Sequence, residues 1–182
     1  YLKYNNLNKY QPEYKIFDNS DEKGIFHYIN LLNYEFVVKA DGLYGGKGVR
    51  IYSLNNYKEC FEYCNRIIQG GDNFVIEEKL YGEEFVLMSF CDGKNIKHMP
   101  ITKDYKDLSK ENDIKTGGMG SILLENHSMP FLLENDITEC RELNKLIMLN
   151  LSRYDNIGYK GILYGSFMKT NKGIKLIEYN AR

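Results

Sequence analysis

A glycine-rich segment that carries a lysine lies between two short apolar stretches and restricts the local fold most strongly. Four glycines fall within the seven residues 42–48, and Lys47 lies among them. Residues 35–39 and 49–52 on either side contain aromatic and β-branched side chains, which favour strands. Glycine has no Cβ atom and therefore adopts the backbone conformations that tight turns require. The pattern predicts an antiparallel hairpin with a lysine at its tip.

This hairpin tip differs from the two common glycine motifs that bind nucleotides. A P-loop requires G-x-x-x-x-G-K-[ST], but Asp41 stands at the first glycine position and Gly48 replaces the hydroxyl residue. The dinucleotide fingerprint opens a helix, whereas this segment runs into a strand. Backbone N–H groups at such a tip approach phosphate closely, and Lys47 and Lys39 add positive charge. We therefore expect a phosphate-binding flap, and the alternative is a solvated hairpin with surface lysines.

Glu178 and Asn180 are separated by one residue in the predicted strand 174–179 near the end of the chain. Residues two apart on a strand point to the same face, so the two side chains converge, flanked by Leu176 and Ile174. Carboxylate and amide oxygens suit a hard divalent cation, which takes further oxygens from phosphate and water. The spacing predicts a site for Mg²⁺ or Mn²⁺.

The bulk composition excludes several classes of protein. The 182 residues carry a formal net charge of −1 with the basic residues spread out, so we expect no nucleic-acid partner. No apolar stretch approaches the roughly 20 residues that span a bilayer, so we expect no membrane insertion. The four cysteines lack zinc-type spacing, and Cys60 and Cys64 share one helical face. We interpret them as buried apolar side chains in a protein of the reducing cytoplasm.

Hydrophobic periodicity predicts an α+β fold with mostly antiparallel strands. Helices are expected at residues 55–69 and 135–153, with a shorter one from Asp21 that has Ser20 as its N-cap. We interpret the polar, glycine-terminated stretch 103–120 as a long functional loop. Strands are expected at residues 13–17, 35–39, 49–52, 73–77, 84–91, 96–101, 159–168 and 174–179.

Two further segments have the composition of a nucleotide site. Residues 75–84 run from a strand through a turn into another strand, where backbone groups are suited to read an adenine edge. Glu84 has a carboxylate that is suited to accept both ribose hydroxyls, although a solvent-facing acidic turn is the alternative. Residues 116–120 form a second glycine cluster, whose consecutive N–H groups make either an anion-binding concavity or a tight loop.

Five motifs follow one another along the chain. They are Lys39-Ala40-Asp41-Gly42-Leu43 with Gly46-Lys47-Gly48-Val49, Ile76-Glu77-Glu78 with Gly82-Glu83-Glu84, Thr116-Gly117-Gly118-Met119-Gly120, Tyr159-Lys160-Gly161-Ile162-Leu163-Tyr164-Gly165, and Ile177-Glu178-Tyr179-Asn180-Ala181-Arg182. In this order they resemble the ATP-grasp domain of glycinamide ribonucleotide synthetase, also called phosphoribosylamine–glycine ligase, over nearly the whole chain. The resemblance implies an ATP-grasp fold, with two α+β lobes that grip ATP. Residues 35–82 would form the lid lobe, residues 83–182 the core lobe, and residues 1–34 a linker and the start of the region.

The resemblance also implies roles for individual residues. Lys39 would contact the phosphates, Glu77 would lie near the adenine amino group, and Glu84 would bind the ribose. Glu178 and Asn180 would hold Mg²⁺ or Mn²⁺, while Arg182 and Lys47 would take part in catalysis. The residues implied to bind ATP are Lys39, Gly45, Gly46, Lys47, Gly48, Glu77, Glu78, Leu80 and Glu84.

The implied reaction joins glycine to 5-phosphoribosylamine through glycyl phosphate in purine biosynthesis. The family has Gln-Asp-His-Lys-Arg where residues 103–107 read Lys-Asp-Tyr-Lys-Asp, and Asp-Thr-Gly-Pro-Asn where residues 111–115 read Glu-Asn-Asp-Ile-Lys. An ATP-grasp ligase with another carboxylate and amine, and a non-catalytic nucleotide-binding module, are therefore the alternatives. The chain begins at Tyr1 and stops directly after the last motif, so we expect flanking domains in a longer protein.

Overall fold

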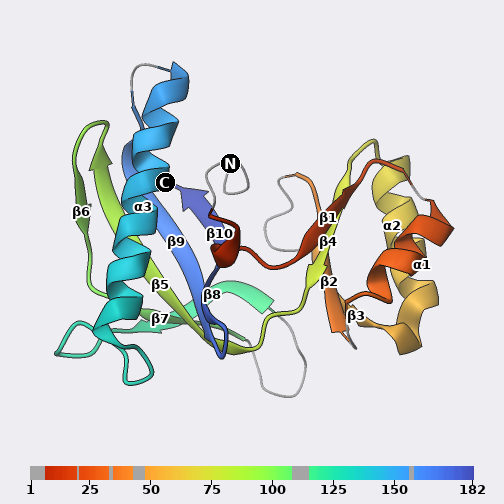
Figure 1. The fold of residues 1–182 in the computed structure, drawn as a ribbon, viewed down its shortest axis with the longest axis horizontal. Helices are drawn as coiled ribbons and strands as arrows, with labels where there is room; N and C mark the ends of the chain where they lie inside the picture. Colours follow the sequence, from red (N-terminus) through yellow and green to blue (C-terminus); the bar gives the residue numbers. More distant parts are fainter. Residues whose placement is uncertain (1–6, 20, 33–34, 43–47, 108–114, 156–157) are drawn as a thin grey trace. The chain divides into compact units, whose positions relative to one another are not determined.

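The chain divides into two compact units, which are described separately (Figure 1). The computed structural model describes residues 7–19, 21–32, 35–42, 48–107, 115–155 and 158–182. The small unit is Pro12–Leu80, and the large unit contains Tyr81–Arg182 together with the described residues up to Gln11. No helix within these ranges has both the length and the hydropathy needed to cross a membrane.

The small unit is a four-stranded antiparallel sheet with two helices on one face (Figure 1). Alternate side chains of β2 and β4 point toward the helices. Phe36, Val38, Phe74 and Ile76 therefore form one core with the buried side chains of the helices. Cys60 and Cys64 belong to this core and are fully buried, as predicted. In sheet order the strands are β1 (Tyr14–Phe17), β4 (Phe74–Glu78), β2 (Glu35–Ala40) and β3 (Val49–Ser53), and the helices are α1 (Glu22–Ile29) and α2 (Tyr57–Gln69).

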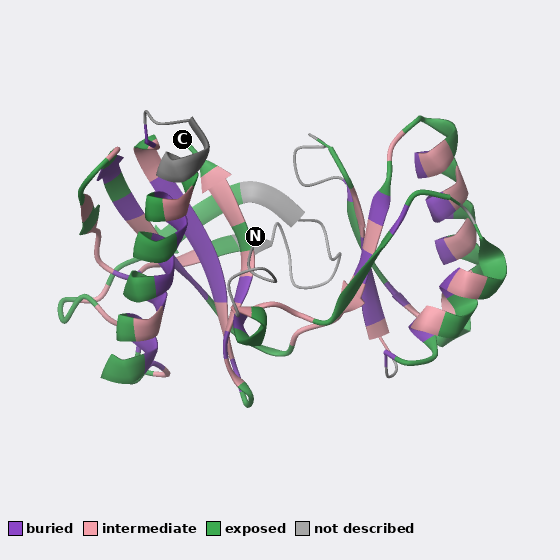
Figure 2. Cartoon of the chain, turned by 45° about the horizontal axis from the view of Figure 1, so that its top comes forward, coloured by how far each residue is buried: buried purple, intermediate pink, exposed green. Residues whose placement is uncertain are grey.

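The large unit is a second four-stranded antiparallel sheet with the long helix α3 (Glu134–Asp155) on one face (Figure 1). Phe85, Leu87, Leu163 and Phe167 point toward this helix and pack against its buried side chains. Figure 2 shows the buried residues in purple along the central strands. Tyr10 of the short 3₁₀ turn η2 (Asn8–Tyr10) joins the same core. In sheet order the strands are β10 (Gly173–Ala181), β9 (Lys160–Thr170), β5 (Gly82–Asp92) and β6 (Ile96–His98).

The interpretation of residues 103–120 as a long loop is wrong. Strands β7 (Lys103–Asp107) and β8 (Lys115–Ile122) pair antiparallel as a separate two-stranded sheet, and residues 108–114 between them lie outside the described residues. These strands pair only with each other and are rich in charged residues and glycine, so they lack the apolar alternation by which half-buried strands are recognised.

The other predicted elements are present with shifted ends. The predicted helix at 55–69 begins as a 3₁₀ turn, η3 (Leu54–Asn56), before α2. The choice of Ser20 as N-cap is wrong, because α1 begins at Glu22 with Asp21 in the N-cap position; Ser20 itself lies outside the described residues. The predicted strand 96–101 ends at His98. Within the expected linker 1–34, β1 and α1 belong to the small unit because β1 pairs with β4.

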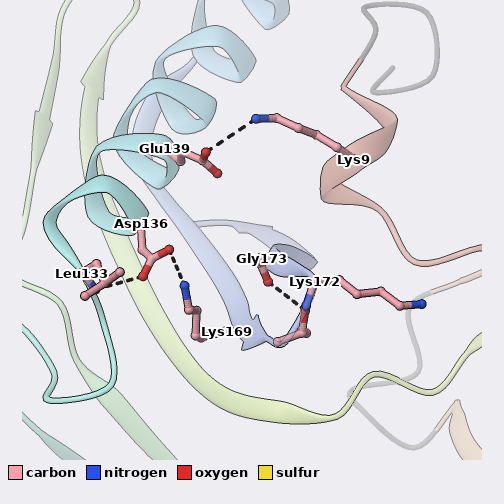
Figure 3. A network of polar contacts seen from close by, with 8 residues as sticks. Lys9, Leu133, Asp136, Glu139, Lys169, Lys172 and Gly173 are labelled. Atoms are coloured by element: carbon pink, nitrogen blue, oxygen red, sulfur yellow. Dashed lines mark hydrogen bonds and ion pairs between the residues drawn. The ribbon is translucent and has the colours of Figure 1, made fainter.

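One carboxylate anchors the first turn of α3 to the sheet (Figure 3). Asp136 accepts the Leu133 backbone N–H at 2.9 Å with one oxygen and the Lys169 ammonium of β9 at 2.6 Å with the other. The Asp136 side chain is 11% exposed, so both bonds are largely shielded from water. The same view shows Lys9 and Glu139, which pair at 3.6 Å with side chains 63% and 45% exposed. The two ion pairs lie on one helix and differ mainly in burial.

Asp136→Ala should lower the free energy of unfolding by about 1–2 kcal/mol, because it removes a helix cap and leaves Lys169 without its partner. Glu139→Ala is the matched control and should change stability by less than about 0.5 kcal/mol, because that ion pair is exposed. Urea denaturation of both variants measures the difference. Equal losses would contradict the importance assigned to the buried carboxylate.

Candidate functional site

Lys39 and Glu77 form an ion pair on the face of the small sheet that α1 and α2 do not cover. Lys39 of β2 lies opposite Val75 of β4, and Glu77 lies opposite Val37, so the two charged residues are diagonal neighbours. Their side chains are 26% and 14% exposed. Burial raises the pKa of Glu77 above the usual range for glutamate, and the Lys39 ammonium opposes that shift. The pair places one shielded cation and one shielded anion side by side.

The glycine-rich flap is fastened at its second strand. Gly48 is buried, and its carbonyl oxygen accepts the Ala40 N–H at 3.0 Å and the Tyr63 hydroxyl at 3.0 Å. The Arg50 guanidinium lies 4.2 Å from the centre of the Tyr63 ring and adds a cation–π contact on the helical side. The predicted phosphate contacts at residues 45–47 lie outside the described residues.

The acidic end of β4 and the two residues after it are held within the small unit. The Glu13 N–H donates to Glu78 Oε1 at 3.1 Å, and the Glu78 N–H donates to the Glu13 carbonyl oxygen at 2.8 Å. Lys79 pairs with Glu35 at 2.8 Å. Leu80 is partly buried at the end of the unit. The Glu78 carboxylate therefore holds the Glu13 backbone, and the ion pair between Lys79 and Glu35 holds the residue that follows.

In the large unit, a β-bulge decides which side chains of β10 reach the candidate metal site. Leu176 pairs with Phe167, but the next pairing partners are Glu178 and Ser166, so one residue is inserted between Leu176 and Glu178. Leu176 and Ile174 are buried in the core beneath α3, whereas Glu178 is exposed. The prediction that Leu176 and Ile174 flank the Glu178–Asn180 pair on one face is therefore wrong. The extra residue exchanges the faces of everything that follows it.

Tyr179 takes the core-facing position after the bulge. Its ring packs edge-on against Phe167 with centroids 6.3 Å apart, and its hydroxyl donates to Asn144 Oδ1 of α3 at 2.8 Å. Asn144 is fully buried and donates to the Leu87 carbonyl oxygen and to Ser89 Oγ. Because Tyr179 points inward, Glu178 and Asn180 on either side of it point to the face opposite α3.

Space for this arrangement comes from Gly165, which lies opposite Tyr179 in β9. A Cβ atom at Gly165 would lie 2.6 Å from Phe167 Cε2 and 3.1 Å from Asn144 Oδ1. Any larger residue would therefore displace the groups that hold Tyr179 inward. Gly165, the last residue of the fourth sequence motif, therefore has a packing function on the opposite side of the sheet from the candidate metal site.

The two predicted metal ligands meet as the sequence spacing predicts. Asn180 Nδ2 donates to Glu178 Oε1 at 3.0 Å, so the carboxylate and the carboxamide are adjacent on one face. Hard oxygen donors of this kind fit Mg²⁺ or Mn²⁺. Among the described residues no group of three or more histidine, cysteine or acidic side chains is suited to hold a metal ion. An ion at Glu178 and Asn180 would therefore rely on phosphate and water oxygens for its remaining ligands.

Three residues that the sequence interpretation left without a role join this face. The Tyr164 hydroxyl donates to Asp104 Oδ2 at 2.6 Å, and the Ser121 hydroxyl donates to Asp104 Oδ1 at 2.7 Å. Tyr164 lies opposite Asn180 in the β9–β10 pairing, and the Arg182 guanidinium lies 5.2 Å from the centre of the Tyr164 ring. The available signals were the position of Tyr164 inside one motif and the retention of Asp104 in another, in which Lys106 is also kept and the other three residues differ.

Glu84 lies on the same face of the large sheet, opposite α3, but nearer the start of β5. It is exposed on β5 and pairs with Met168, which points to the same side of β9 as Tyr164. Glu84, Glu178, Asn180 and Arg182 therefore share one face of the large unit, and Lys39 and Glu77 share one face of the small unit.

Comparison with known proteins identifies the family. The family described as phosphoribosylglycinamide synthetase, ATP-grasp (A) domain, matches residues 3–182. The chain belongs to this family. The phosphoribosylamine–glycine ligase of Methanocaldococcus jannaschii is 40% identical over 188 residues, which cover 100% of this chain and 40% of that protein. The chain spans about two fifths of the length of the curated relatives it matches.

Solved structures confirm the predicted α+β, ATP-grasp fold. Phosphoribosylamine–glycine ligase from Thermotoga maritima is similar with a TM-score of 0.75 and 28% identity, over 94% of this chain and 43% of that one. The ADP complex of N5-carboxyaminoimidazole ribonucleotide synthetase has a TM-score of 0.67 at 18% identity, over 94% of this chain and 40% of that one. At that identity the likeness shows the fold alone.

Lys39→Met should make stability fall more steeply as the pH rises. A glutamate with a raised folded-state pKa stabilises the fold fully below its unfolded pKa, and this stabilisation is lost as the pH rises through the folded pKa. Removing the Lys39 cation raises the pKa of Glu77 further, so the loss grows and extends to higher pH. Thermal unfolding between about pH 4 and pH 8 measures the slope.

The control for this effect is the double variant Lys39→Met/Glu77→Gln, which lacks both the cation and the titrating group. Its stability should show none of the added dependence on pH. A Lys39→Met protein with the wild-type pH profile would contradict the coupling between the two side chains.

Proposed function

We propose that the chain is the nucleotide-binding part of a phosphoribosylamine–glycine ligase that acts in purine biosynthesis. The observation that supports this most strongly is the match of residues 3–182 to the family. Glu178, Asn180 and Arg182 on one sheet face add to it, because they are the residues proposed to hold the metal and the anionic reactants. The four cysteines are free and buried, which agrees with a protein of the reducing cytoplasm.

The residues proposed to bind ATP are described unit by unit. In the small unit, Lys39 would contact phosphate, Glu77 would lie near the adenine amino group, and the backbone from Glu78 to Leu80 would run along the adenine edge. Gly45, Gly46, Lys47 and Gly48 would close over the β- and γ-phosphates, and the two bonds to the Gly48 carbonyl oxygen would act as the base of that flap. In the large unit, Glu84 would accept hydrogen bonds from the ribose hydroxyls.

The desolvated Lys39–Glu77 pair suits this role for a physical reason. Glu77 balances the Lys39 charge in the absence of nucleotide, and a phosphate offers Lys39 an alternative anionic partner. Glu77 would then be available to accept a hydrogen bond from an amino group. The raised pKa of Glu77 reflects the burial that makes each of these interactions stronger than it would be in water.

The chemical step brings together two anions, the glycine carboxylate and the γ-phosphate. The carboxylate oxygen attacks the γ-phosphorus, the bond to ADP breaks, and glycyl phosphate forms. The amine of 5-phosphoribosylamine then attacks the carbonyl carbon and phosphate leaves. Mg²⁺ or Mn²⁺ held by Glu178 and Asn180 would supply charge neutralisation on the phosphates. Positioning and electrostatic stabilisation carry reactions of this kind, so no side-chain nucleophile is needed.

Arg182 would stabilise the anionic reactants. Its backbone is fixed by paired hydrogen bonds with Ile162 at 2.8 and 3.1 Å, and its guanidinium lies over the Tyr164 ring. A planar guanidinium offers two parallel donors to a carboxylate or an acyl phosphate. Arg182 and Lys47 are the two residues that we assign to catalysis.

A second candidate is an ATP-grasp ligase that joins another carboxylate and amine. The altered sequence of β7 favours it, because Asp104 of this strand accepts a hydrogen bond from Tyr164, whose ring lies beneath the Arg182 guanidinium. Phosphate release by the full-length protein, measured across the amino acids with 5-phosphoribosylamine, separates the two candidates. Release with glycine alone supports the first, and release with a different amino acid supports the second.

Glu178→Gln in the full-length protein should lower kcat for ATP- and glycine-dependent phosphate release by about 100-fold or more, because a metal ligand is lost. Glu139→Gln changes an exposed carboxylate on α3 and should leave kcat unchanged. Titration with Mg²⁺ should show a raised requirement only in Glu178→Gln. Full turnover by that variant would remove Glu178 from the site, and absence of turnover in the wild-type protein would favour a non-catalytic nucleotide-binding module.

Lys47→Ala should weaken ATP binding more than ADP binding, because Lys47 is assigned to the terminal phosphates. Dissociation constants from calorimetry with each nucleotide give the ratio. Lys58→Ala removes an exposed charge from α2 and should change neither constant. Equal losses for ATP and ADP in Lys47→Ala would place the lysine elsewhere along the nucleotide.

A further inference from the structure

Tyr164 connects three parts of the large unit that lie far apart in the sequence. It is 9% exposed in the middle of β9 and lies opposite Asn180 of β10. Its hydroxyl reaches Asp104 of β7 at 2.6 Å, and its ring lies beneath the Arg182 guanidinium at 5.2 Å. The Tyr164 side chain therefore contacts β7 and Arg182, and its backbone pairs with Asn180, one of the two predicted metal ligands.

The bond from Tyr164 to Asp104 has a fixed direction. Burial, followed by the adjacent Asp104 carboxylate, raises the pKa of Tyr164 well above its usual range, so the hydroxyl keeps its proton and donates. Ser121, which pairs with Asp104 across the hairpin, donates to the other carboxylate oxygen. Both Asp104 oxygens are thus oriented by hydroxyl groups from different elements.

The hydrogen bond from Tyr164 to Asp104 matters because strands β7 and β8 pair with neither four-stranded sheet. The approach of the β7–β8 hairpin is guided by the Val86–Thr102 bridge just before β7 and by the ion pair of Lys103 with Glu83 at 2.5 Å. Both contacts lie at the start of the hairpin. Tyr164 adds a buried contact at the next residue, on the face that carries Glu178, Asn180 and Arg182.

We propose that Tyr164 is a positioning residue of the ligase reaction, which locks Asp104 of the hairpin and the Arg182 guanidinium at a fixed separation. The inference rests on the proposed function and adds a contact that fixes the β7–β8 hairpin relative to Arg182, the residue assigned to the activated carboxylate. Asp104 carries the negative charge at one end of the tyrosine, and Arg182 carries the positive charge over its ring.

The test compares Tyr164→Phe, Asp104→Asn and the double variant in the full-length protein. Tyr164→Phe keeps the ring beneath Arg182 and removes only the hydroxyl. It should lower kcat/KM for ATP- and glycine-dependent phosphate release at least about tenfold, because small displacements of reacting groups cost large factors in rate. The dissociation constant for ATP should stay at the wild-type value. The double variant should lose no more than the worse single variant, because the two changes break one interaction.

Tyr57→Phe is the matched control, since it deletes a hydroxyl that donates to the Glu22 carbonyl oxygen at 3.3 Å within the small unit. Its kcat/KM should equal that of the wild-type protein. Equal activities of Tyr164→Phe and Tyr57→Phe, or losses that multiply in the double variant, would overturn the proposal. If Tyr164→Phe does not fold, Asp104→Ala, which removes the acceptor of the same hydrogen bond, replaces it in the comparison with Tyr57→Phe.

Hydrogen–deuterium exchange separates this inference from the ligase assignment. Amides of residues 103–107 and 118–122 should exchange faster in Tyr164→Phe than in Tyr57→Phe, whatever the substrates are. A wild-type protein that releases no phosphate with glycine refutes the ligase assignment, and the exchange rates then decide on Tyr164 alone. Unchanged exchange in the hairpin refutes the positioning role even where the ligase activity is present.

Discussion

The inward turn of Tyr179 after the bulge in β10 is the constraint on which the rest of the large unit depends. Its hydroxyl satisfies the fully buried Asn144, its ring packs on Phe167, and Gly165 leaves the room for both. An unsatisfied Asn144 would cost roughly 1–3 kcal/mol, so the strand is held in this register by a buried polar bond as well as by packing. Glu178 and Asn180 are thereby kept out of the core.

Charged side chains held in fixed contacts are the common feature of both units. Lys39 with Glu77 in one, and Asp104 with Tyr164 and Arg182 in the other, are arranged on sheet faces that the helices do not cover. A sheet with one face packed under helices offers its other face as a rigid platform, on which the spacing of side chains follows the pleat. The proposed ligase chemistry would use such platforms, because its rate would come from placing charges rather than from a reactive side chain.

The hairpin at residues 103–122 shows where pattern analysis reached its limit. The sequences of its two strands have no alternation of apolar and polar residues, so hydrophobic periodicity gave no signal for them. The family motifs marked the segment as functional but did not predict its strands. The same limit applies to the N-cap of α1, where Ser20 and Asp21 are both suitable capping residues and local backbone geometry made the choice. Helices α2 and α3 were predictable because apolar residues recur at helical spacing over several turns of each, and these residues are buried in the two cores.

The amino-acid sequence by itself determined the α+β fold class, the family and the adjacency of Glu178 and Asn180, because these follow from local periodicity, motif order and a spacing of two. Tertiary structure alone decided which face those two residues occupy, since the inserted residue of the bulge is visible only in the pairing of β10 with β9. It also decided that Asp104, Tyr164 and Arg182 meet, because side chains 60 residues apart approach only when strands from separate hairpins are brought together by the core.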